Sequence, residues 1–458
     1  MVAMGTRGMT GESTKHTFSL KSFLIYLFVA FSSFYLPGCG SNSSEVNNSN
    51  VSKPTILVWH WMTDRQAPLA ELAKKYEEKT GVKIKFELYA PSDAYSQKVR
   101  AAAQGNNLPD IFGILAEKRD FAAFIKAGHI ADLTSNMNAE NGKWKNIFFA
   151  KALAGNEFND GNMYGVPSGI YGVPIDVTTI QMLYNKDLFK ELGLDPQKPP
   201  ATFDEFLAIG AKLKAKNMQG LVSGWGEMWM IDCLANNYAF NIMGKDKLIA
   251  TIRGDVPYTD PDWIHVLSLF KKMQDAGVLA NGLVTMINKT AEQLFANGKA
   301  VFAFNGSWCV NVYKGMNPNL NYGVMLPPRV SDKYPMSIWG GAGTSFMVND
   351  RSPRKEEAIK FLQWFTEKDQ QAFFAEKTNN LPANKESIKN IPEVLAQFSD
   401  DIENATHPNT WGVSEFPAVI EALDKGIQSI IIGEKSPEQV AQDVQKIKER
   451  ELAKKKAK

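Results

Sequence analysis

The chain has 458 residues, of which 44% are hydrophobic, and a formal net charge of +2. This length allows two or three units of the usual domain size of about 100–200 residues. The balanced charge gives no electrostatic basis for nucleic-acid binding, and the basic tail, Lys446 to Lys458, is typical of a solvated helix end. The five histidines lack the spacing that places two on one helical face, so we expect no metal site and no cofactor.

The N-terminus has the layout of an export signal. Ser22 to Leu36 is a 15-residue apolar run preceded by Arg7, Lys15 and Lys21. A full membrane span needs about 20 residues, so this shorter run indicates a secretory signal. We therefore expect the protein to be exported.

The end of the run, Leu36-Pro37-Gly38-Cys39, resembles a lipobox. Residues 1–39 are accordingly predicted to be a signal peptide with a lipid anchor at Cys39. Pro37 departs from the small residues usual at its position, and the alternative is an ordinary signal peptide with an incidental cysteine. Residues 40–53 are rich in Ser and Asn with almost no apolar content, which predicts a flexible tether.

The first part of the mature chain alternates β-prone and helical segments, which predicts a parallel sheet with helices on both faces. The first strand opens into Trp59, His60, Trp61 and Asp64 at its carboxyl end, where α/β sheets bind ligands. A single histidine beside two tryptophans is more often a hydrogen-bonding neighbour than a catalytic base. The predicted elements are Thr55–Trp59, Pro68–Lys79, Val82–Leu88, Tyr95–Gln104 and Asp110–Leu115.

Two copies of a Tyr-Gly-Val-Pro motif follow, at 164–167 and 171–174. The two copies lie seven residues apart, and Leu183–Phe189 follows them. Proline and glycine suit a hinge because they limit the backbone path, although they also mark ordinary loops. Farther on, Thr202 and Glu205 form the capping-box pattern for a helix over Phe203–Lys216.

Another helix is predicted to begin near Glu227, Trp229 and Asp232. Trp225 and Trp229 are four residues apart, so one helical face could offer two rings for stacking on a ligand. Core packing explains the same spacing and is the favoured alternative. Trp263 lies at helical spacing from two apolar residues and is expected in the core.

The segment from Thr290 to Trp308 is predicted to be a helix, a tight turn and a buried strand. Gly298 can adopt the left-handed conformation that ends a helix, and Val301–Phe304 is β-prone. The strand delivers Asn305, Ser307 and Trp308 to its carboxyl end. Small polar side chains beside a large aromatic ring suit a sugar, whereas the alternative is a surface turn with a buried tryptophan.

The remaining segments are predicted to add a strand, a long helix and a turn. Trp339 and Gly340 precede a strand over Thr344–Val348, and Pro353–Lys377 is predicted to be one long amphipathic helix. The glycines at 340–343 are not followed by Gly-Lys-Ser/Thr, so a nucleotide-binding loop is not expected. Leu381-Pro382-Ala383 marks a further turn before the C-terminal helices.

Several of these segments, in order along nearly the whole mature chain, resemble family 1 extracellular solute-binding proteins, which serve ATP-driven sugar importers. The resemblance implies a two-lobed α/β fold, each lobe a mostly parallel sheet flanked by helices, with the ligand in a cleft between hinged lobes. The resembling segments are Leu108-Pro109-Asp110, Tyr171–Pro174, Leu183–Phe189, Phe295–Ala300, Asn305–Trp308, Gly340-Gly341 and Leu381–Ala383.

The resemblance also implies three crossings between the lobes, near Tyr171, Gly340 and Pro382. Either Tyr-Gly-Val-Pro copy could be the first crossing, and we favour the second because its distance to Tyr184 fits the family pattern, which makes Tyr171 a candidate ligand residue. The first lobe is predicted to contain 54–173 and 340–383, and the second 174–339 and 384–458. Asp110 either lies near the cleft or caps a turn. The full set of candidate ligand residues is Trp59, His60, Trp61, Asp64, Asp110, Tyr171, Glu227, Trp229, Asn305, Ser307, Trp308, Trp339, Gly340 and Trp411.

The resemblance implies a binding protein that delivers a carbohydrate, most simply an oligosaccharide, to membrane permease subunits. Tryptophans in the predicted cleft loops favour a sugar over an ion or an amino acid. We expect a monomer, anchored by lipid, with no catalytic residues. One alternative is a secreted carbohydrate-active enzyme, which needs two carboxylates about 5–10 Å apart, and no short motif pairs them. Another is a purely structural lipoprotein, which leaves the aromatic loops unexplained.

Cys233 and Cys309 are the two cysteines beyond the lipobox. They could form a disulfide in an oxidising compartment if their Cα atoms approached within about 7 Å. The sequence does not fix this distance. We favour two free, mostly buried thiols.

Overall fold

The computed structural model describes residues 54–90, 92–115, 118–341, 343–400, 402, 405–406 and 413–456. The predicted signal peptide, Cys39 and the tether fall on residues 1–53, and Trp411 falls on residues 407–412, so these predictions lie outside the described residues. Within the described part, no helix is long and apolar enough to cross a membrane.

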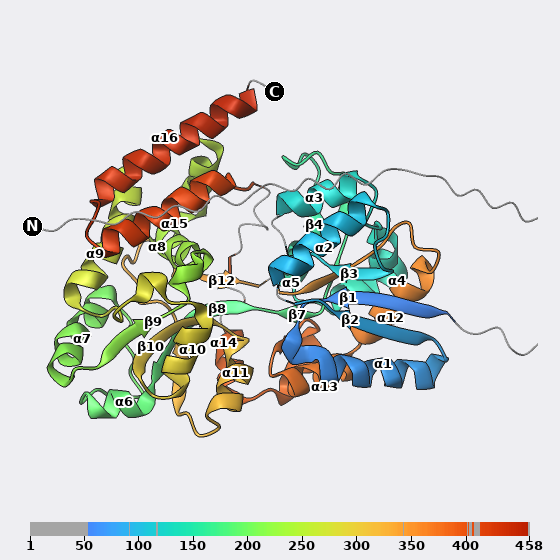
Figure 1. Cartoon of the computed structure of the whole chain (residues 1–458), viewed down its shortest axis with the longest axis horizontal. Helices are drawn as coiled ribbons and strands as arrows, with labels where there is room; N and C mark the ends of the chain where they lie inside the picture. The colour runs from blue at the N-terminus through green and yellow to red at the C-terminus, as the bar shows by residue number, and fades with distance from the viewer. Residues whose placement is uncertain are drawn as a thin grey trace, which may run out of the picture. The chain divides into compact units, whose positions relative to one another are not determined.

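The first lobe is built on a five-stranded sheet with the order β2-β1-β3-β13-β6. Figure 1 labels β1, β2 and β3 of this sheet. β2 and β3 run parallel to β1, whereas β13 runs antiparallel to both β3 and β6. Apolar cores lie on both faces: α1, α12 and α13 contribute to one, α2 and α3 to the other. The strands are β1 (Thr55–His60), β2 (Lys83–Leu88), β3 (Ile111–Gly113), β6 (Val173–Pro174) and β13 (Ser345–Val348).

The helices of this lobe follow the chain in two stretches. Shorter strands β4 and β5 pair with each other beside them. The elements are η1 (Thr63–Arg65), α1 (Gln66–Thr80), α2 (Ser92–Gln104), α3 (Lys118–Lys126), α4 (Thr134–Asn146), α5 (Ala150–Ala154), β4 (Glu157–Phe158), β5 (Gly169–Ile170), α12 (Lys355–Phe365), α13 (Lys368–Thr378) and η4 (Lys385–Asn390).

The second lobe is built on a sheet whose central strand is β8. β10, β11 and β12 all run antiparallel to β8, whereas β9 is parallel to β10 and β15 is parallel to β12. One large apolar core joins this sheet to the surrounding helices. The strands are β8 (Thr179–Asn185), β9 (Gln219–Val222), β10 (Ala300–Gly306), β11 (Tyr322–Met325), β12 (Ile338–Gly340) and β15 (Ala405–Thr406).

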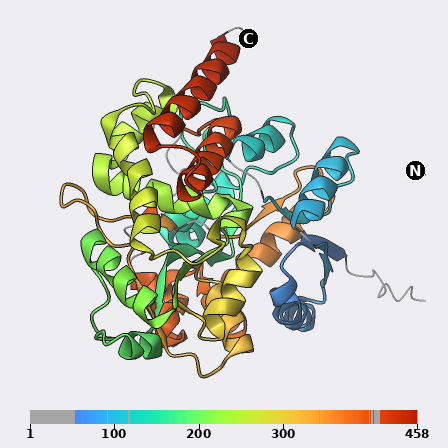
Figure 2. The ribbon, with the colours of Figure 1, turned by 60° about the vertical axis from the view of Figure 1, so that its left-hand side comes forward.

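The C-terminal helices α15 and α16 pack beside α8 and α9 of the second lobe, as the red and yellow-green helices of Figure 2 show. The helices of this lobe are α6 (Lys186–Glu191), α7 (Phe203–Lys216), η2 (Trp225–Glu227), α8 (Trp229–Arg253), α9 (Pro261–Ala276), η3 (Leu283–Thr285), α10 (Asn288–Ala296), α11 (Cys309–Met316), α14 (Glu393–Asp400), α15 (Pro417–Ile431) and α16 (Pro437–Lys456).

The fold is the predicted two-lobed α/β fold, but its sheets are mixed and not mostly parallel. The reason lies in the crossings. β13 enters the first lobe from the second, opposite in direction to the N-terminal strands, so it pairs antiparallel with β3. In the second lobe, β8 enters and β12 leaves, and these two strands also pair antiparallel.

The crossings are held together near Asp176. Strand β7 (Asp176–Val177) connects β6 to β8 and pairs with β14 (Leu381–Pro382). The buried Arg65 guanidinium forms an ion pair with Asp176, which also accepts a hydrogen bond from the Thr344 backbone. Gly340 has a φ of 137°, and a Cβ there would lie 2.2 Å from the Thr178 carbonyl oxygen. Only glycine fits at this crossing.

Local sequence rules predicted several elements well and one poorly. The Thr202 capping box is present, with Glu205 bonded back to the Thr202 backbone. The long helix predicted over Pro353–Lys377 is wrong, because α12 ends at Phe365 and α13 begins at Lys368. The Thr366 hydroxyl bonds to carbonyls of the preceding turn and accepts from the Trp144 indole, which fixes the break.

The two described cysteines are free and buried, as expected. Burial raises the pKa of the Cys233 and Cys309 thiols well above the usual value, and nearby carboxylates add to the rise. Both thiols therefore stay protonated at neutral pH.

Candidate functional site

The carboxyl end of β10 carries the polar and aromatic residues that the sequence singled out. Helix α10 ends at Ala296, and Gly298 adopts the left-handed conformation with a φ of 64°. The chain then enters β10, in which every residue is buried. This helix, turn and strand place Asn305, Ser307 and Trp308 at the edge of the sheet, just before α11.

Trp308 lies flat against the backbone of Gly306. A Cβ on Gly306 would fall 1.8 Å from the six-membered part of the indole, so only glycine leaves room for the ring. The centroid of the Trp308 ring lies 6.1 Å from that of Trp229, with 42° between the planes. Trp308 is partly buried, and Trp229 remains 42% exposed. Together the two tryptophans form an aromatic surface that solvent reaches.

Trp229 and Trp225 have different environments despite their helical spacing. Trp225 is fully buried against Phe270, as core packing requires. Trp229 begins α8 after Met228, which has a φ of 63° and a ψ of −56°. This region is sparsely populated for residues with a side chain, and such residues cluster at binding sites. Core packing, the favoured interpretation, therefore holds for Trp225, whereas Trp229 is exposed to solvent.

A buried polar network lies beside Trp308. The Oε1 atom of Glu292 accepts hydrogen bonds from Asn288 Nδ2 at 2.9 Å and from Asn305 Nδ2 at 3.1 Å. Burial raises the pKa of Glu292. Hydrogen bonds from Asn305, Trp308 and Asn288 oppose the rise, and the nearby Glu227 adds to it. Glu227 is exposed and accepts from the Asn288 backbone at 2.9 Å.

The Ser307 hydroxyl is fully buried and has no hydrogen-bond partner among the described residues. Its backbone N–H donates to the Thr179 carbonyl, which fixes the turn after β10. Ser307 is therefore enclosed beneath the neighbouring Trp308 rather than exposed beside it.

The first lobe carries a second tryptophan of similar design. Trp61 follows β1 and lies over Gly113 at the end of β3, where a Cβ would come within 2.3 Å of the indole. Its ring centroid is 5.1 Å from that of Tyr95. The Tyr95 hydroxyl donates to the Trp59 or Gly113 carbonyl and accepts from the Gly113 N–H. Asp64 is exposed nearby in η1, with a carboxylate oxygen 3.8 Å from Arg65 Nε.

Trp59 and His60 are buried within the lobe. The Trp59 indole donates to Glu87 at 3.0 Å, and Lys98 Nζ lies 4.3 Å from its ring centroid. His60 is fully buried, and neither ring nitrogen has a hydrogen-bond partner among the described residues. Burial, aided by the charge of Arg65, lowers the pKa of His60 to about 4, so it is neutral at pH 7. Trp59 and His60 are therefore interior residues at the carboxyl end of β1.

Asp110 and Tyr171 are not placed with the tryptophans. Asp110 precedes β3, at the opposite end of the strand from Gly113. Its carboxylate accepts hydrogen bonds from the Leu57 backbone, Ser352 and Arg354. These bonds agree with the alternative that Asp110 caps a turn. Tyr171 is buried against Phe158. A carboxylate or phenol engaged in this way has little capacity left for a ligand.

The second crossing carries Trp339 and Gly340. Trp339 is partly buried in β12, with Ile180 on β8 and Thr406 on β15 as its register partners. Glu292 and the two supporting glycines, Gly113 and Gly306, were not among the predicted site residues. For Glu292 a signal existed, because it shares a helical face with Phe295 and Ala296, where a charged residue is unusual.

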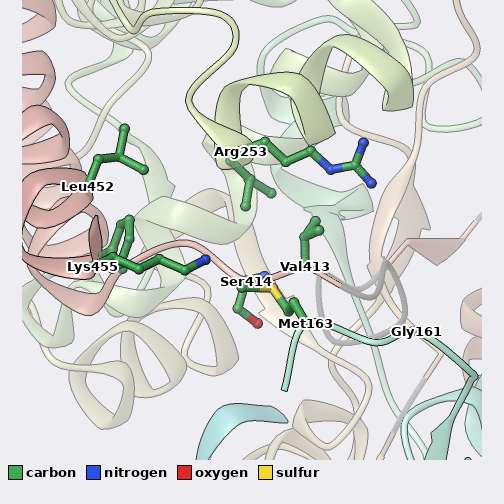
Figure 3. Close-up of a pocket in the computed structure, with 9 residues that line it drawn as sticks. Gly161, Met163, Arg253, Val413, Ser414, Leu452 and Lys455 are labelled. Carbon is green, nitrogen blue, oxygen red and sulfur yellow. Dashed lines mark hydrogen bonds between the residues drawn. The ribbon is translucent and has the colours of Figure 1, made fainter. Parts of the chain in front are cut away.

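A separate cavity of about 220 Å³ lies near the start of α15 (Figure 3). There the Ser414 N–H donates to the Met163 sulfur at 3.3 Å, and the Ser414 hydroxyl bonds to that of Tyr164. No predicted ligand residue of the described part of the chain lines this cavity, and its wall comes from four separate stretches. The lining residues are Gly161, Met163, Ile252, Arg253, Val413, Ser414, Phe416, Leu452 and Lys455.

No cluster of three or more His, Cys, Asp or Glu in the described part of the chain could hold a metal ion. The candidate site thus consists of partly exposed indoles together with hydroxyl, amide and carboxylate groups beside them. This set suits reversible binding of a polar molecule with apolar faces. Two lobes joined by three crossings, with such residues at the strand ends, define a two-lobed ligand-binding protein.

The chain belongs to the bacterial extracellular solute-binding proteins, whose family model matches residues 71–406. This membership makes it an exported protein. A binding protein of Brucella abortus is 27% identical over 81% of this chain and 87% of its own length. The maltooligosaccharide ABC transporter solute-binding lipoprotein of Streptococcus pneumoniae is 23% identical over 93% and 95%. A solved chitin oligosaccharide binding protein shares the fold, with a TM-score of 0.71 and 23% identity, covering 86% of this chain and 98% of that one.

Proposed function

We propose that the protein is the substrate-binding component of an ABC importer and that it binds an oligosaccharide between its two lobes. The observation that carries this proposal is the pair of tryptophan surfaces, Trp61 in the first lobe and Trp308 with Trp229 in the second. Each rests on a glycine at the end of a strand. The similarity to the maltooligosaccharide-binding lipoprotein of S. pneumoniae and to the chitin oligosaccharide binding protein supports this ligand class.

The chemistry of these surfaces fits a sugar. The flat apolar face of a pyranose stacks on an indole, and the hydroxyls at the ring edge need hydrogen-bond partners. Asp64 and Glu227 are exposed acceptors near the two surfaces. Several sugar units could be held at once, because the indoles lie on different lobes.

Lobe closure would couple this binding to import. A ligand that contacts both lobes favours the closed arrangement by its additional contacts there. The membrane permease subunits then recognise the closed form. The segments that move least during this change are expected to be the crossings at β7 and β14, where Asp176 holds Arg65 and Thr344.

Titration calorimetry with maltotriose, raffinose and triacetylchitotriose tests the proposal. We expect at least one of these sugars to bind with a Kd of about 1 μM or tighter, which corresponds to about −8.2 kcal/mol. Prolonged incubation followed by chromatography should return the sugar intact. Cleavage products would support the carbohydrate-active enzyme instead, and absence of binding across a wider oligosaccharide panel would contradict the ligand class.

We further propose that Cys39 carries a lipid anchor and that the mature protein is a monomer on the outer face of the cell membrane. The apolar run, the lipobox-like sequence and the polar stretch after it support the anchor. Replacing Cys39→Ser should move the protein from the membrane fraction to the soluble fraction. A wild-type protein that is already soluble after cell fractionation would refute the anchor.

A further inference from the structure

Glu292 is a buried carboxylate whose hydrogen-bond donors are Trp308 and two asparagines beside it. It lies on the inner face of α10 and is 7% exposed. Its Oε1 atom accepts a hydrogen bond from Asn288 on the same helix and another from Asn305 on β10. The side chain of Trp308 is a third hydrogen-bond donor to the carboxylate. A carboxylate that receives three donors from three segments fixes their relative positions.

We propose that Glu292 is a positioning residue for ligand binding, which holds the edge of the Trp308 indole while Gly306 supports the face of the ring. The inference rests on the proposed function, because it assumes that Trp308 stacks on a sugar. Glu292 itself does not touch the ligand. It keeps the ring in the binding orientation before the ligand arrives, so less rotational freedom is lost on binding.

The charged groups around Glu292 indicate that its burial destabilises the folded state. We infer that the protein tolerates this cost because Glu292 positions Trp308. The titratable groups that interact with Glu292 from neighbouring elements are Glu227 of η2 and Cys309 and Tyr313 of α11. None of these is a cation. No ion pair to Glu292 is present among the described residues. A buried carboxylate without a cation destabilises the folded state, so stability alone does not account for it.

The sign of the pH effect follows from this environment. The pKa of Glu292 is raised in the folded protein, so the folded state holds its proton more tightly than the unfolded state. Between the unfolded and folded pKa values, stability falls as pH rises. Binding should show the opposite trend. Protonation of the Glu292 carboxylate places an O–H donor among three groups that already donate to it, which weakens its hold on Trp308. Sugar affinity should therefore weaken as pH falls through the raised pKa of Glu292.

The decisive experiment is a double-mutant cycle between Glu292 and Trp308, measured with the tightest-binding sugar of the panel. Glu292→Gln should weaken binding about tenfold, which is about 1.4 kcal/mol. In a Trp308→Ala background the same change should weaken binding less than twofold, because its effect passes through the ring. Equal losses in both backgrounds, or no loss in either, would overturn the proposal.

Two readouts separate positioning from a merely structural role. The Glu292→Gln protein should melt at or above the wild-type temperature at pH 7.5 while its affinity falls, and its affinity should no longer weaken in acid. The exposed Glu421, paired with Lys425 on α15, provides the control, and Glu421→Gln should keep the wild-type pH profile. A Glu292→Gln protein that loses stability and affinity together would contradict positioning.

A measurement without ligand distinguishes failure of this inference from failure of the proposed function. The emission of Trp308, taken as the difference from a Trp308→Phe protein, should become more depolarised in Glu292→Gln because the ring moves more freely. If no sugar binds but the ring is loosened, the ligand class is wrong and the positioning stands. If sugars bind and the ring is unchanged, the positioning is wrong.

Discussion

Trp61 and Trp308 use the same steric device in the two lobes but differ in what holds the ring. In both cases the indole lies on a glycine at the end of a strand, Gly113 or Gly306. Behind Trp61 stands Tyr95, whose hydroxyl is satisfied by backbone groups. Behind Trp308 stands the carboxylate of Glu292. Close packing can therefore orient a ring without charge, whereas a carboxylate makes that orientation sensitive to pH.

The largest effect on binding is expected when a larger side chain replaces Gly306, the glycine on which the Trp308 ring lies. In Gly306→Val the new side chain would occupy the position of the indole, and the ring must leave. Sugar affinity should fall about 100-fold, or about 2.8 kcal/mol. Overpacking should also lower stability by about 1–3 kcal/mol. Calorimetric titration and denaturant melts measure both, and a folded variant with wild-type affinity would exclude Trp308 from the ligand site.

Removal of the Trp308 ring should weaken binding by tenfold or more and change the stability of the empty protein much less. The matched control is Trp225→Ala, because Trp225 is fully buried in the core. Loss of a core tryptophan costs about 3–5 kcal/mol. If Trp308→Ala costs as much stability as Trp225→Ala, Trp308 is a core residue.

Trp61→Ala should weaken binding by about fivefold to tenfold, about 1–1.4 kcal/mol, and the loss should be the same at pH 5 and pH 7.5. Within the described part of the chain, no hydrogen bond joins the Trp61 ring to a carboxylate, so no titrating group fixes the orientation of this ring. The pH dependence of affinity should therefore survive in Trp61→Ala and disappear in Trp308→Ala. Identical pH profiles in the two variants would remove the distinction between the lobes.

The smallest effect on binding is expected for Asp110→Asn. This carboxylate accepts from the Leu57 backbone, Ser352 and Arg354 at the far end of β3 from Gly113. Loss of its charge-assisted hydrogen bonds should lower stability by about 1–3 kcal/mol. Sugar affinity should change less than twofold. A large loss of affinity without loss of stability would return Asp110 to the candidate site.

Local rules predicted the parts of the fold that depend on neighbours in sequence. The end of α10, the left-handed Gly298 and the buried strand after it follow from residue type and spacing. The Thr202 capping box is local in the same sense. Such features need no knowledge of the rest of the chain.

The candidate site was only partly predictable because its details depend on contacts between distant segments. Trp229 and Trp225 share one helical spacing, yet a core formed with α9 takes only Trp225. The break after Phe365 depends on Trp144, more than 200 residues earlier, which donates to Thr366. His60 looked like a ligand contact beside two tryptophans, but strand packing buries it fully.

The two buried cysteines have a practical consequence for studying lobe motion. Cys233 and Cys309 both belong to the second lobe, and their thiols are buried and protonated at neutral pH. Maleimide reagents attack exposed thiolates, so these two positions should remain unlabelled in the folded protein. With Cys39 replaced, one new surface cysteine in each lobe could carry a donor and an acceptor dye. Single-molecule energy transfer would then follow opening and closing in a protein that keeps its native core intact.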